Sequence, residues 1–297
     1  MAEAPRGVGL ALGLAVAAMS TAAILIRLVQ EAGPLAIAFH RMALASLVLA
    51  PFALGRGRAE LAALARRDLA VLGLIGVILG LHFATWITSL KLTTVASSVV
   101  LVTFHPAIVA LLGMAWLGEG LRARGWAGIA VALGGAVLLV QGDLGLEARY
   151  LAGDALAFAG AVFAALYFLG GRRLRPRLSL TTYAFPVYAA ASGTLLVLAL
   201  ASGERLAGFG WPDYALMAAL ALGPQLAGHT VANWSLRWVP AAVVSTAIVG
   251  EPIGSSLLAV VILAEVPPAA SVVGGALILA GIYLVASGQR PKVAPVD

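Results

Sequence analysis

Two ionisable residues stand immediately before prolines in long apolar segments, and they are the first candidates for chemistry. His105 precedes Pro106 and Glu251 precedes Pro252, each about 16 Å along its predicted helix and so near the middle of a bilayer. An ionisable side chain at that depth costs about 2.5 to 3.5 kcal/mol on insertion scales, which makes each one a functional hypothesis. We expect Glu251 to engage a substrate ammonium group or to exchange a proton. The alternative is that Glu251 is hydrogen-bonded to neighbouring backbone as part of the scaffold.

The two prolines predict helix kinks. Pro106 and Pro252 have no N–H, so the carbonyls of Val102 and Ile248 lose their helical partners. A freed carbonyl in a membrane is tolerated only where a cavity or another helix satisfies it. The sequence therefore predicts a pair of kinked helices beside a substrate site, with a plain scaffold kink as the alternative.

Two further stripes of polar residues recur at helical spacing. One consists of His82, Trp86 and Ser89, and the other of Gln225, His229 and Asn233. The spacings i, i+4, i+7 and i, i+4, i+8 place each stripe on one helical face. Lipid would penalise such a face, so we expect the stripes to line a cavity. Hydrogen bonding between helices is the alternative, worth only about 0.6 kcal/mol on average in membranes.

Aromatic side chains in the apolar segments could stack on an aromatic or cationic substrate. The candidates are Trp86, Tyr167, Tyr188 and Trp234, and bundle packing or interfacial anchoring explains each of them equally well. The residues that we predict to bind substrate are His82, Trp86, His105, Tyr167, Tyr188, Gln225, His229, Asn233 and Glu251.

Several kinds of chemistry are excluded. The chain has no cysteine, neither lysine precedes Ser or Thr as a Walker A loop requires, and no G-x-S-x-G or H-x-x-x-H pattern occurs. We therefore predict no cofactor, no metal site, no catalytic residue and no enzymatic activity. The rival classes are a membrane-embedded enzyme and a passive pore.

These candidates must be positioned by membrane-spanning helices. Of the 297 residues, 62% are hydrophobic and only 11% are charged, against roughly 25% charged in soluble domains. A spanning helix needs about 20 mostly apolar residues. We predict an all-α integral membrane protein with ten such helices, including the first segment, which is too long for a signal peptide. The predicted segments are 7–28, 34–54, 68–90, 94–117, 124–141, 152–172, 181–202, 212–236, 240–263 and 269–287.

The basic residues predict the orientation. With a cytoplasmic N-terminus, fourteen of the nineteen lysines and arginines fall on the cytoplasmic side, four fall on the other, and Arg41 stays inside the second helix. We therefore predict both termini in the cytoplasm, in a bacterial-type inner (plasma) membrane. This clustering in short loops argues against a nucleic-acid partner despite the net charge of +6.

The two halves of the sequence repeat with an offset of 146 residues. Because each half holds five helices, an odd number, the second half must be inverted in the membrane. Inverted repeats around a central cavity are typical of secondary transporters that work by alternating access. The repeats are predicted at 7–142 and 153–288. The matched pairs are Arg27 with Arg173, Phe39 with Phe185, Lys91 with Arg237, Ala96 with Ala242, Pro106 with Pro252, Glu119 with Glu265, Gly128 with Gly274 and Gly135 with Gly281.

The duplicated motif resembles a known family. The stretch "PAIVALLGMAWLGE" from Pro106 is followed by Gly128 and Gly135, its copy "PIGSSLLAVVILAE" from Pro252 is followed by Gly274 and Gly281, and "PLAIAFHR" begins at Pro34. These features are similar to the paired domains of the EamA family in the drug/metabolite transporter superfamily. In length and pattern the chain is also similar to the bacterial YddG-type aromatic amino-acid exporters.

The resemblance implies ten helices, a central cavity and export of small metabolites, often amino acids. The expected partners are the lipid bilayer and a small-molecule substrate, with a proton as a further partner of Glu251. Within the motif we expect Glu119 and Glu265 to be loop or cap residues. The four glycines are expected to let helices approach closely.

Overall fold

The computed structural model describes residues 5, 7–93, 95–139, 148–263 and 269–288, and this part of the chain is helical without a β-strand. Glu265 of the repeated motif lies outside these residues. The helices of the first half are α1 (Val8–Met19), α2 (Ala22–Leu28), α3 (Pro34–Leu54), α4 (Arg58–Ala62), α5 (Arg66–Leu92), α6 (Val95–Val102), α7 (His105–Leu117) and α8 (Ala123–Leu139). Those of the second half are α9 (Ala148–Leu174), α10 (Leu180–Ala201), α11 (Trp211–Leu220), the π-helix η1 (Ala221–Thr230), α12 (Val231–Ser235), α13 (Ala241–Ile248), α14 (Glu251–Leu263) and α15 (Ala269–Ser287).

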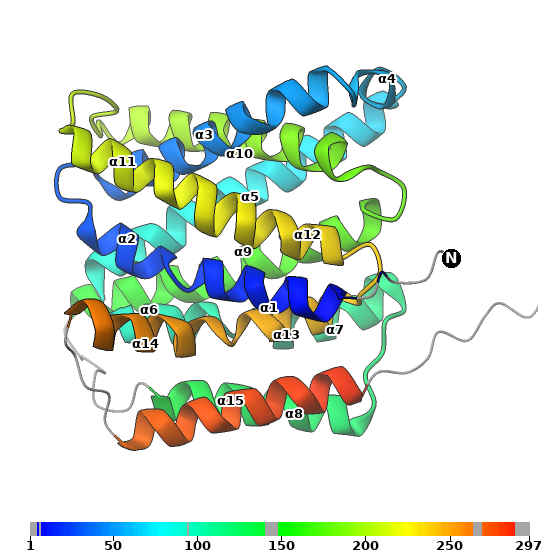
Figure 1. Ribbon diagram of the computed structural model, residues 1–297, viewed down its shortest axis with the longest axis vertical. Helices are drawn as coiled ribbons and strands as arrows, with labels where there is room; N and C mark the ends of the chain where they lie inside the picture. Colours follow the sequence, from blue (N-terminus) through cyan, green and yellow to red (C-terminus); the bar gives the residue numbers. More distant parts are fainter. Residues whose placement is uncertain (1–4, 6, 94, 140–147, 264–268, 289–297) are drawn as a thin grey trace, which may run out of the picture.

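Six helical stretches of the described residues are long and apolar enough to cross a membrane. They are Val8–Leu28, Pro34–Leu54, Arg66–Leu92, Tyr150–Leu174, Leu180–Ala201 and Trp211–Ser235. Four shorter apolar helices accompany them: His105–Leu117, Ala123–Leu138, Ala241–Ser255 and Val272–Val285. Figure 1 shows the helices lying alongside one another, with α8 and α15 as a pair at one end of the bundle and α3 and α4 at the other.

The prolines coincide with helix breaks. α6 ends at Val102 and α7 begins at His105, while α13 ends at Ile248 and α14 begins at Glu251. Pro106 and Pro252 therefore occupy the second residue of a new helix, where a missing N–H costs nothing because that position has no helical acceptor. Each predicted kinked helix is thus two helices in succession.

The helices α3 and α10 pack against each other and exchange carboxylate caps. Glu204, in the linker after α10, accepts hydrogen bonds from the backbone N–H groups of Leu35 and Ala36 at 3.0 Å each, at the start of α3. Glu60, in α4 after α3, accepts from the Ser179 N–H at 2.8 Å and the Thr182 hydroxyl at 2.7 Å, at the start of α10. Each carboxylate satisfies N-terminal donors of the other helix, so the two helices run antiparallel.

The Glu60 cap predicts a pH-dependent contribution to stability. Burial acts to raise the pKa of the Glu60 carboxyl, but the hydrogen bonds from Ser179 and Thr182 outweigh burial and hold this pKa below its ordinary value. Its contribution is therefore complete at neutral pH and is lost as the pH falls through the lowered pKa. We expect Glu60→Gln to cost about 0.5–2 kcal/mol at pH 7. In detergent unfolding measurements the difference from wild type should shrink on acidification; a constant difference would contradict the capping role.

The helices α8 and α15 approach closely through their glycines. A Cβ atom added to Gly135 would lie 2.7 Å from the carbonyl oxygen of Gly274, and one added to Gly128 would lie 2.8 Å from that of Gly281. The neighbours are backbone atoms, which cannot turn away as a flexible side chain could. The predicted close approach of small residues is therefore present between these two helices.

Two adjacent glycines on α8 provide a matched test of this packing. Gly135→Ala should destabilise the protein by about 1–3 kcal/mol, because the new methyl group overpacks the interface with α15. A Cβ on Gly134 meets nothing within 4 Å, so Gly134→Ala should leave stability unchanged or raise it by up to about 1 kcal/mol through helix propensity. Thermal unfolding in detergent measures both, and equal effects would contradict the packing argument.

Candidate functional site

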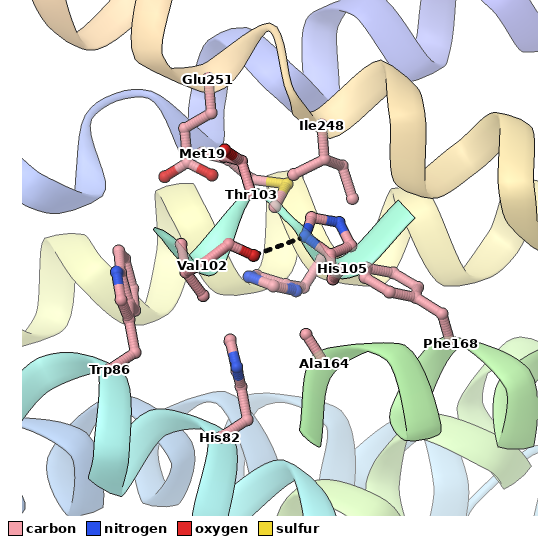
Figure 2. A pocket seen from close by; sticks show the side chains of 11 residues that line it. Met19, His82, Trp86, Val102, Thr103, His105, Ala164, Phe168, Ile248 and Glu251 are labelled. Carbon is pink, nitrogen blue, oxygen red and sulfur yellow. Dashed lines mark hydrogen bonds between the residues drawn. The ribbon is translucent and has the colours of Figure 1, made fainter. Parts of the chain in front are cut away.

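A buried cavity lies where helices of both halves meet, and five of the predicted site residues line it (Figure 2). The predicted lining residues are His82 and Trp86 from α5, His105 from α7, His229 from η1 and Glu251 from α14. The remaining lining residues are Met19, Val102, Thr103, Ala164, Phe168 and Ile248. The space open to the centres of water molecules is about 30 Å³, room for about two waters. The cavity is therefore too small for an amino acid in this conformation.

His105 shows how the first helix break is satisfied. Its ring Nδ1 lies 2.9 Å from the carbonyl oxygen of Val102, the group that Pro106 leaves without a helical donor. A carbonyl oxygen only accepts, so Nδ1 carries the hydrogen. The ring also interacts with the backbone of Ser245 in α13, although Nε2 forms no hydrogen bond of normal geometry among the described residues. It stacks on Phe168 with ring centroids 5.6 Å apart. His105 therefore caps the helix break and borders the cavity.

Glu251 occupies the equivalent place at the second break. It is the first residue of α14, it is 9% exposed, and it faces the cavity (Figure 2). In the described part of the chain no hydrogen bond or ion pair holds its carboxylate. The cation with which it interacts electrostatically is Arg41. A carboxylate in such a position can bind a substrate cation or a proton.

Of the three residues in the polar stripe of α5, the first two line the cavity. His82 donates from Nδ1 to the carbonyl of Gly160 at 2.9 Å, and its ring stacks parallel to Trp86 at 6.1 Å between centroids. The indole N–H of Trp86 is buried without a partner among the described residues. Ser89, the third member, instead hydrogen-bonds Ser98 at 2.5 Å. The α5 stripe thus offers one unpaired hydrogen-bond donor, the Trp86 indole N–H, at the cavity wall.

The other stripe is only partly α-helical. Residues 221–230 form the π-helix η1, which contains Gln225 and His229, whereas Asn233 lies in α12. The hydroxyl of Thr230 accordingly bonds the carbonyl of Gln225 five residues earlier, at 3.1 Å. π-Helical turns are rare and occur frequently at functional sites. The sequence signal was the Gly–Pro pair at 223–224 inside an apolar segment.

Four predicted residues lie outside the cavity lining, in a buried polar network. Asn233 donates from its amide to the Tyr167 hydroxyl and to the carbonyl of His229, the latter at 2.8 Å. Tyr188 shares a hydrogen bond of 2.9 Å with the Thr230 hydroxyl. This network connects α9, α10, η1 and α12, so in this conformation interhelical bonding accounts for Tyr167, Tyr188 and Asn233. The fourth residue, Gln225, is bonded to Arg41.

Arg41 is a buried charge for which the sequence reasoning assigned no role. It is 0% exposed, and its Nε donates to the Gln225 side-chain oxygen at 3.0 Å. Its guanidinium carbon lies 4.2 Å from the centre of the Phe83 ring. The available signal was its position inside a spanning helix, which by itself marks an ionisable residue as a functional candidate.

Two other expectations concern residues away from the cavity. Trp234 packs edge-on against Trp238, with ring centroids 4.7 Å apart, and does not line the cavity. Glu119, expected to be a loop or cap residue, accepts hydrogen bonds from Arg172 Nε at 2.5 Å and from the Ala241 N–H at 3.3 Å. Among the residues that the structure describes, no cluster of three His, Cys, Asp or Glu side chains is suited to hold a metal ion.

Comparisons with known proteins identify the chain's relatives. The sequence model of the EamA-like transporter family matches residues 5–141 and, a second time, residues 151–287. A protein of known crystal structure shares 23% sequence identity and a TM-score of 0.78, over 95% of this chain and 96% of that one. At that identity the similarity establishes the fold alone. No protein of curated function matches significantly.

Proposed function

This chain belongs to the EamA-like transporter family, whose members are membrane transporters, and we propose that it is a secondary transporter exporting small metabolites, above all amino acids. The cavity carries this proposal, because it gathers three histidines, Trp86 and Glu251 inside an apolar bundle. Packing alone gives no reason to retain that many polar groups in a membrane. Together they offer acceptors and one donor to a small polar solute.

We propose aromatic amino acids as the first substrates to test. Flat ring surfaces border the polar groups of the cavity: Trp86 is stacked with His82 and Phe168 with His105. Aromatic rings pack favourably on such surfaces, by about 0.5–1.5 kcal/mol beyond the area that they bury. The similarity to YddG-type exporters favours the same choice.

The proposed mechanism is alternating access between two inverted five-helix repeats, 7–142 and 153–288. The packing between the two halves supports this mechanism because each half contributes equivalent contacts. In the first half, α5 packs on α9, the first helix of the second half. In the second half, η1 packs on α1, the first helix of the first half. The reciprocal Glu60 and Glu204 caps have the same exchanged arrangement. Since the cavity holds about two waters, an amino acid needs a more open conformation to enter.

We further propose ten spans with both termini in the cytoplasm, in a bacterial-type inner membrane. Six long apolar stretches and four shorter apolar helices among the described residues support this count. Reporter fusions at Asp297 and within 143–150 should fall on opposite sides of the membrane. Fusions that report the same side would contradict this topology.

Uptake into proteoliposomes tests the function. A panel of labelled amino acids, amines and nucleosides is offered with and without a pH gradient. We expect saturable uptake of an amino acid that unlabelled substrate competes away. Non-saturable flux would indicate a passive pore, and recovery of a chemically altered product would indicate a membrane-embedded enzyme.

A further inference from the structure

The guanidinium of Arg41 is a buried cation with most of its donors unused. Its Nη1 and Nη2 have no hydrogen-bond partner among the described residues, and it forms no ion pair there. Only Nε is engaged, by Gln225. Buried donors that form no hydrogen bond oppose folding, so stability does not explain why Arg41 is retained.

Gln225 is held beside Arg41 in one orientation. Its side-chain oxygen accepts from Arg41 Nε at 3.0 Å, and its Nε2 is buried near the Tyr188 hydroxyl without forming a hydrogen bond of normal geometry among the described residues. The pair thus combines the free fork of a guanidinium with an amide N–H₂ group, all of them donors. The group that complements such a set is a planar anion, and a carboxylate matches the two-pronged geometry of arginine.

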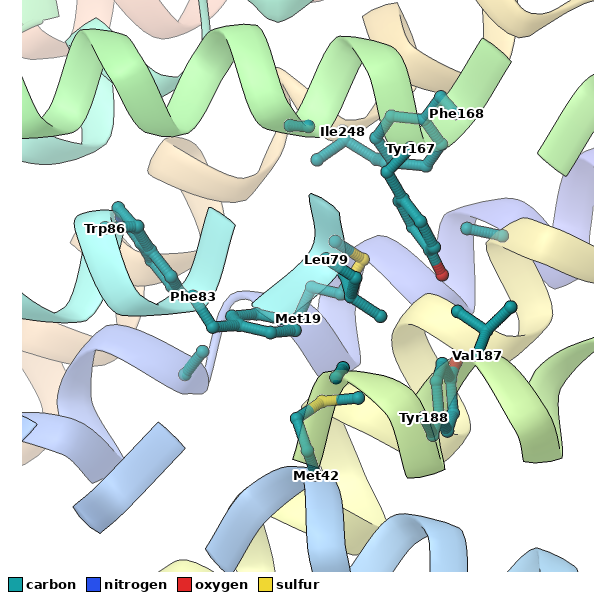
Figure 3. Packing of buried hydrophobic residues seen from close by; sticks show 14 of the residues in the cluster. Met19, Met42, Leu79, Phe83, Trp86, Tyr167, Phe168, Val187, Tyr188 and Ile248 are labelled. Atoms are coloured by element: carbon teal, nitrogen blue, oxygen red, sulfur yellow. The ribbon is translucent and has the colours of Figure 1, made fainter. Parts of the chain in front are cut away.

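This pair lies one aromatic layer behind the cavity wall. The Phe83 ring covers the guanidinium at 4.2 Å and meets the ring of His229, a wall residue, at 5.4 Å. Arg41 is near enough to His82, His229 and Glu251, all of which line the cavity, to interact with them electrostatically. In Figure 3, Phe83 from α5 and Met42, the residue after Arg41 on α3, project into the same packed region. If the Phe83 ring moved aside, the Arg41 guanidinium would be exposed to the cavity.

We propose that Arg41 and Gln225 form the carboxylate subsite of the transporter, reached when the cavity widens and Phe83 moves aside. The substrate carboxylate accepts from Nη1 and Nη2 of Arg41 and from Nε2 of Gln225, while Glu251 takes the ammonium group. Because the site binds both a carboxylate and an ammonium group, its substrates are zwitterionic amino acids. Simple amines and simple acids each lack one of these two groups. This inference rests on the proposed transport function and assigns its specificity to Arg41.

The test compares three compounds with one side chain. They are the amino acid that wild type transports best, its decarboxylated amine and its deaminated acid; for phenylalanine these are phenethylamine and 3-phenylpropionate. For wild type, we expect the ratio of maximal transport rate to KM to be at least tenfold higher for the amino acid than for the amine. Arg41→Gln should raise the KM for the amino acid at least tenfold and change that for the amine less than twofold. Arg41→Lys, which keeps the charge without the fork, should fall between. The control is Arg205→Gln, which removes an arginine whose side chain is 60% exposed and should leave both KM values unchanged.

The outcomes separate this inference from the proposed function. If wild type transports no amino acid, the proposed function fails. If wild type transports one but Arg41→Gln changes the KM of amino acid and amine by the same factor, or changes neither, the carboxylate subsite is wrong and the function stands. Should Arg41→Gln not be recovered as folded protein, the same comparison is made with Arg41→Lys and Gln225→Leu. A selective rise in the KM for the amino acid supports the subsite, and an equal change overturns it.

Discussion

Replacing Glu251 by glutamine should lower transport at least tenfold while leaving the protein folded. The substitution keeps the shape of the side chain and removes the only acidic charge among the described residues that line the cavity. A hydrogen bond to a charged group is worth about 1.5–3 kcal/mol, and tenfold corresponds to about 1.4 kcal/mol. Initial uptake rates in proteoliposomes, at matched amounts of folded protein, measure the effect.

The pH gradient separates the two roles of Glu251. If it exchanges a proton, wild-type uptake depends on the gradient and the Glu251→Gln variant loses that dependence while retaining exchange. If it only attracts an ammonium group, the gradient has no effect in either protein and KM rises. The other ionisable groups at the cavity are His82, His105 and His229, with Arg41 behind them; replacing each histidine by glutamine tests whether it contributes to a pH effect.

A matched variant controls for loss of a carboxylate as such. Glu31 lies on an exposed loop, where its side chain is 49% exposed and faces Arg205 at 3.6 Å. Glu31→Gln should transport like wild type. Unchanged transport and unchanged pH dependence in Glu251→Gln would show that Glu251 belongs only to the helix break at Pro252.

The buried pair of Glu119 and Arg172 should give the largest effect on stability. Arg172 donates from Nε to Glu119 at 2.5 Å and from Nη1 to the carbonyl of Leu236 at 2.6 Å. The two side chains are 11% and 9% exposed. Glu119→Leu would leave the arginine buried without a counter-charge, which costs about 3–5 kcal/mol. Reversible unfolding in mixed micelles measures the loss.

The double variant distinguishes the ion pair from simple loss of packing. Glu119→Leu combined with Arg172→Leu should cost less than the sum of the single changes, by at least about 1 kcal/mol, because no unpaired charge remains. The exposed pair of Glu31 and Arg205 is the control, and Glu31→Leu should cost at most about 1 kcal/mol. Additive effects of Glu119→Leu and Arg172→Leu would mean that the two charges do not stabilise each other.

The helix breaks and the repeat could be predicted from the sequence because their causes are local. In a bilayer, the backbone N–H and C=O groups of an apolar run of about 20 residues must form their hydrogen bonds within the run, so the run becomes a helix. Pro106 and Pro252 remove a hydrogen bond wherever they stand, and they placed His105 and Glu251 at the breaks that border the cavity. The 146-residue offset likewise needs only the order of residues.

Which polar residues meet was decided only by the tertiary structure. Helical spacing grouped Gln225, His229 and Asn233 on one face, yet only His229 lines the cavity, because η1 is π-helical and its rotation follows from packing against α1 and α3. Arg41 and Gln225 are 184 residues apart, and no local pattern connects them. A sequence indicates which segments are helical, whereas the local period of a helix and the direction in which each face points depend on how all the helices pack together.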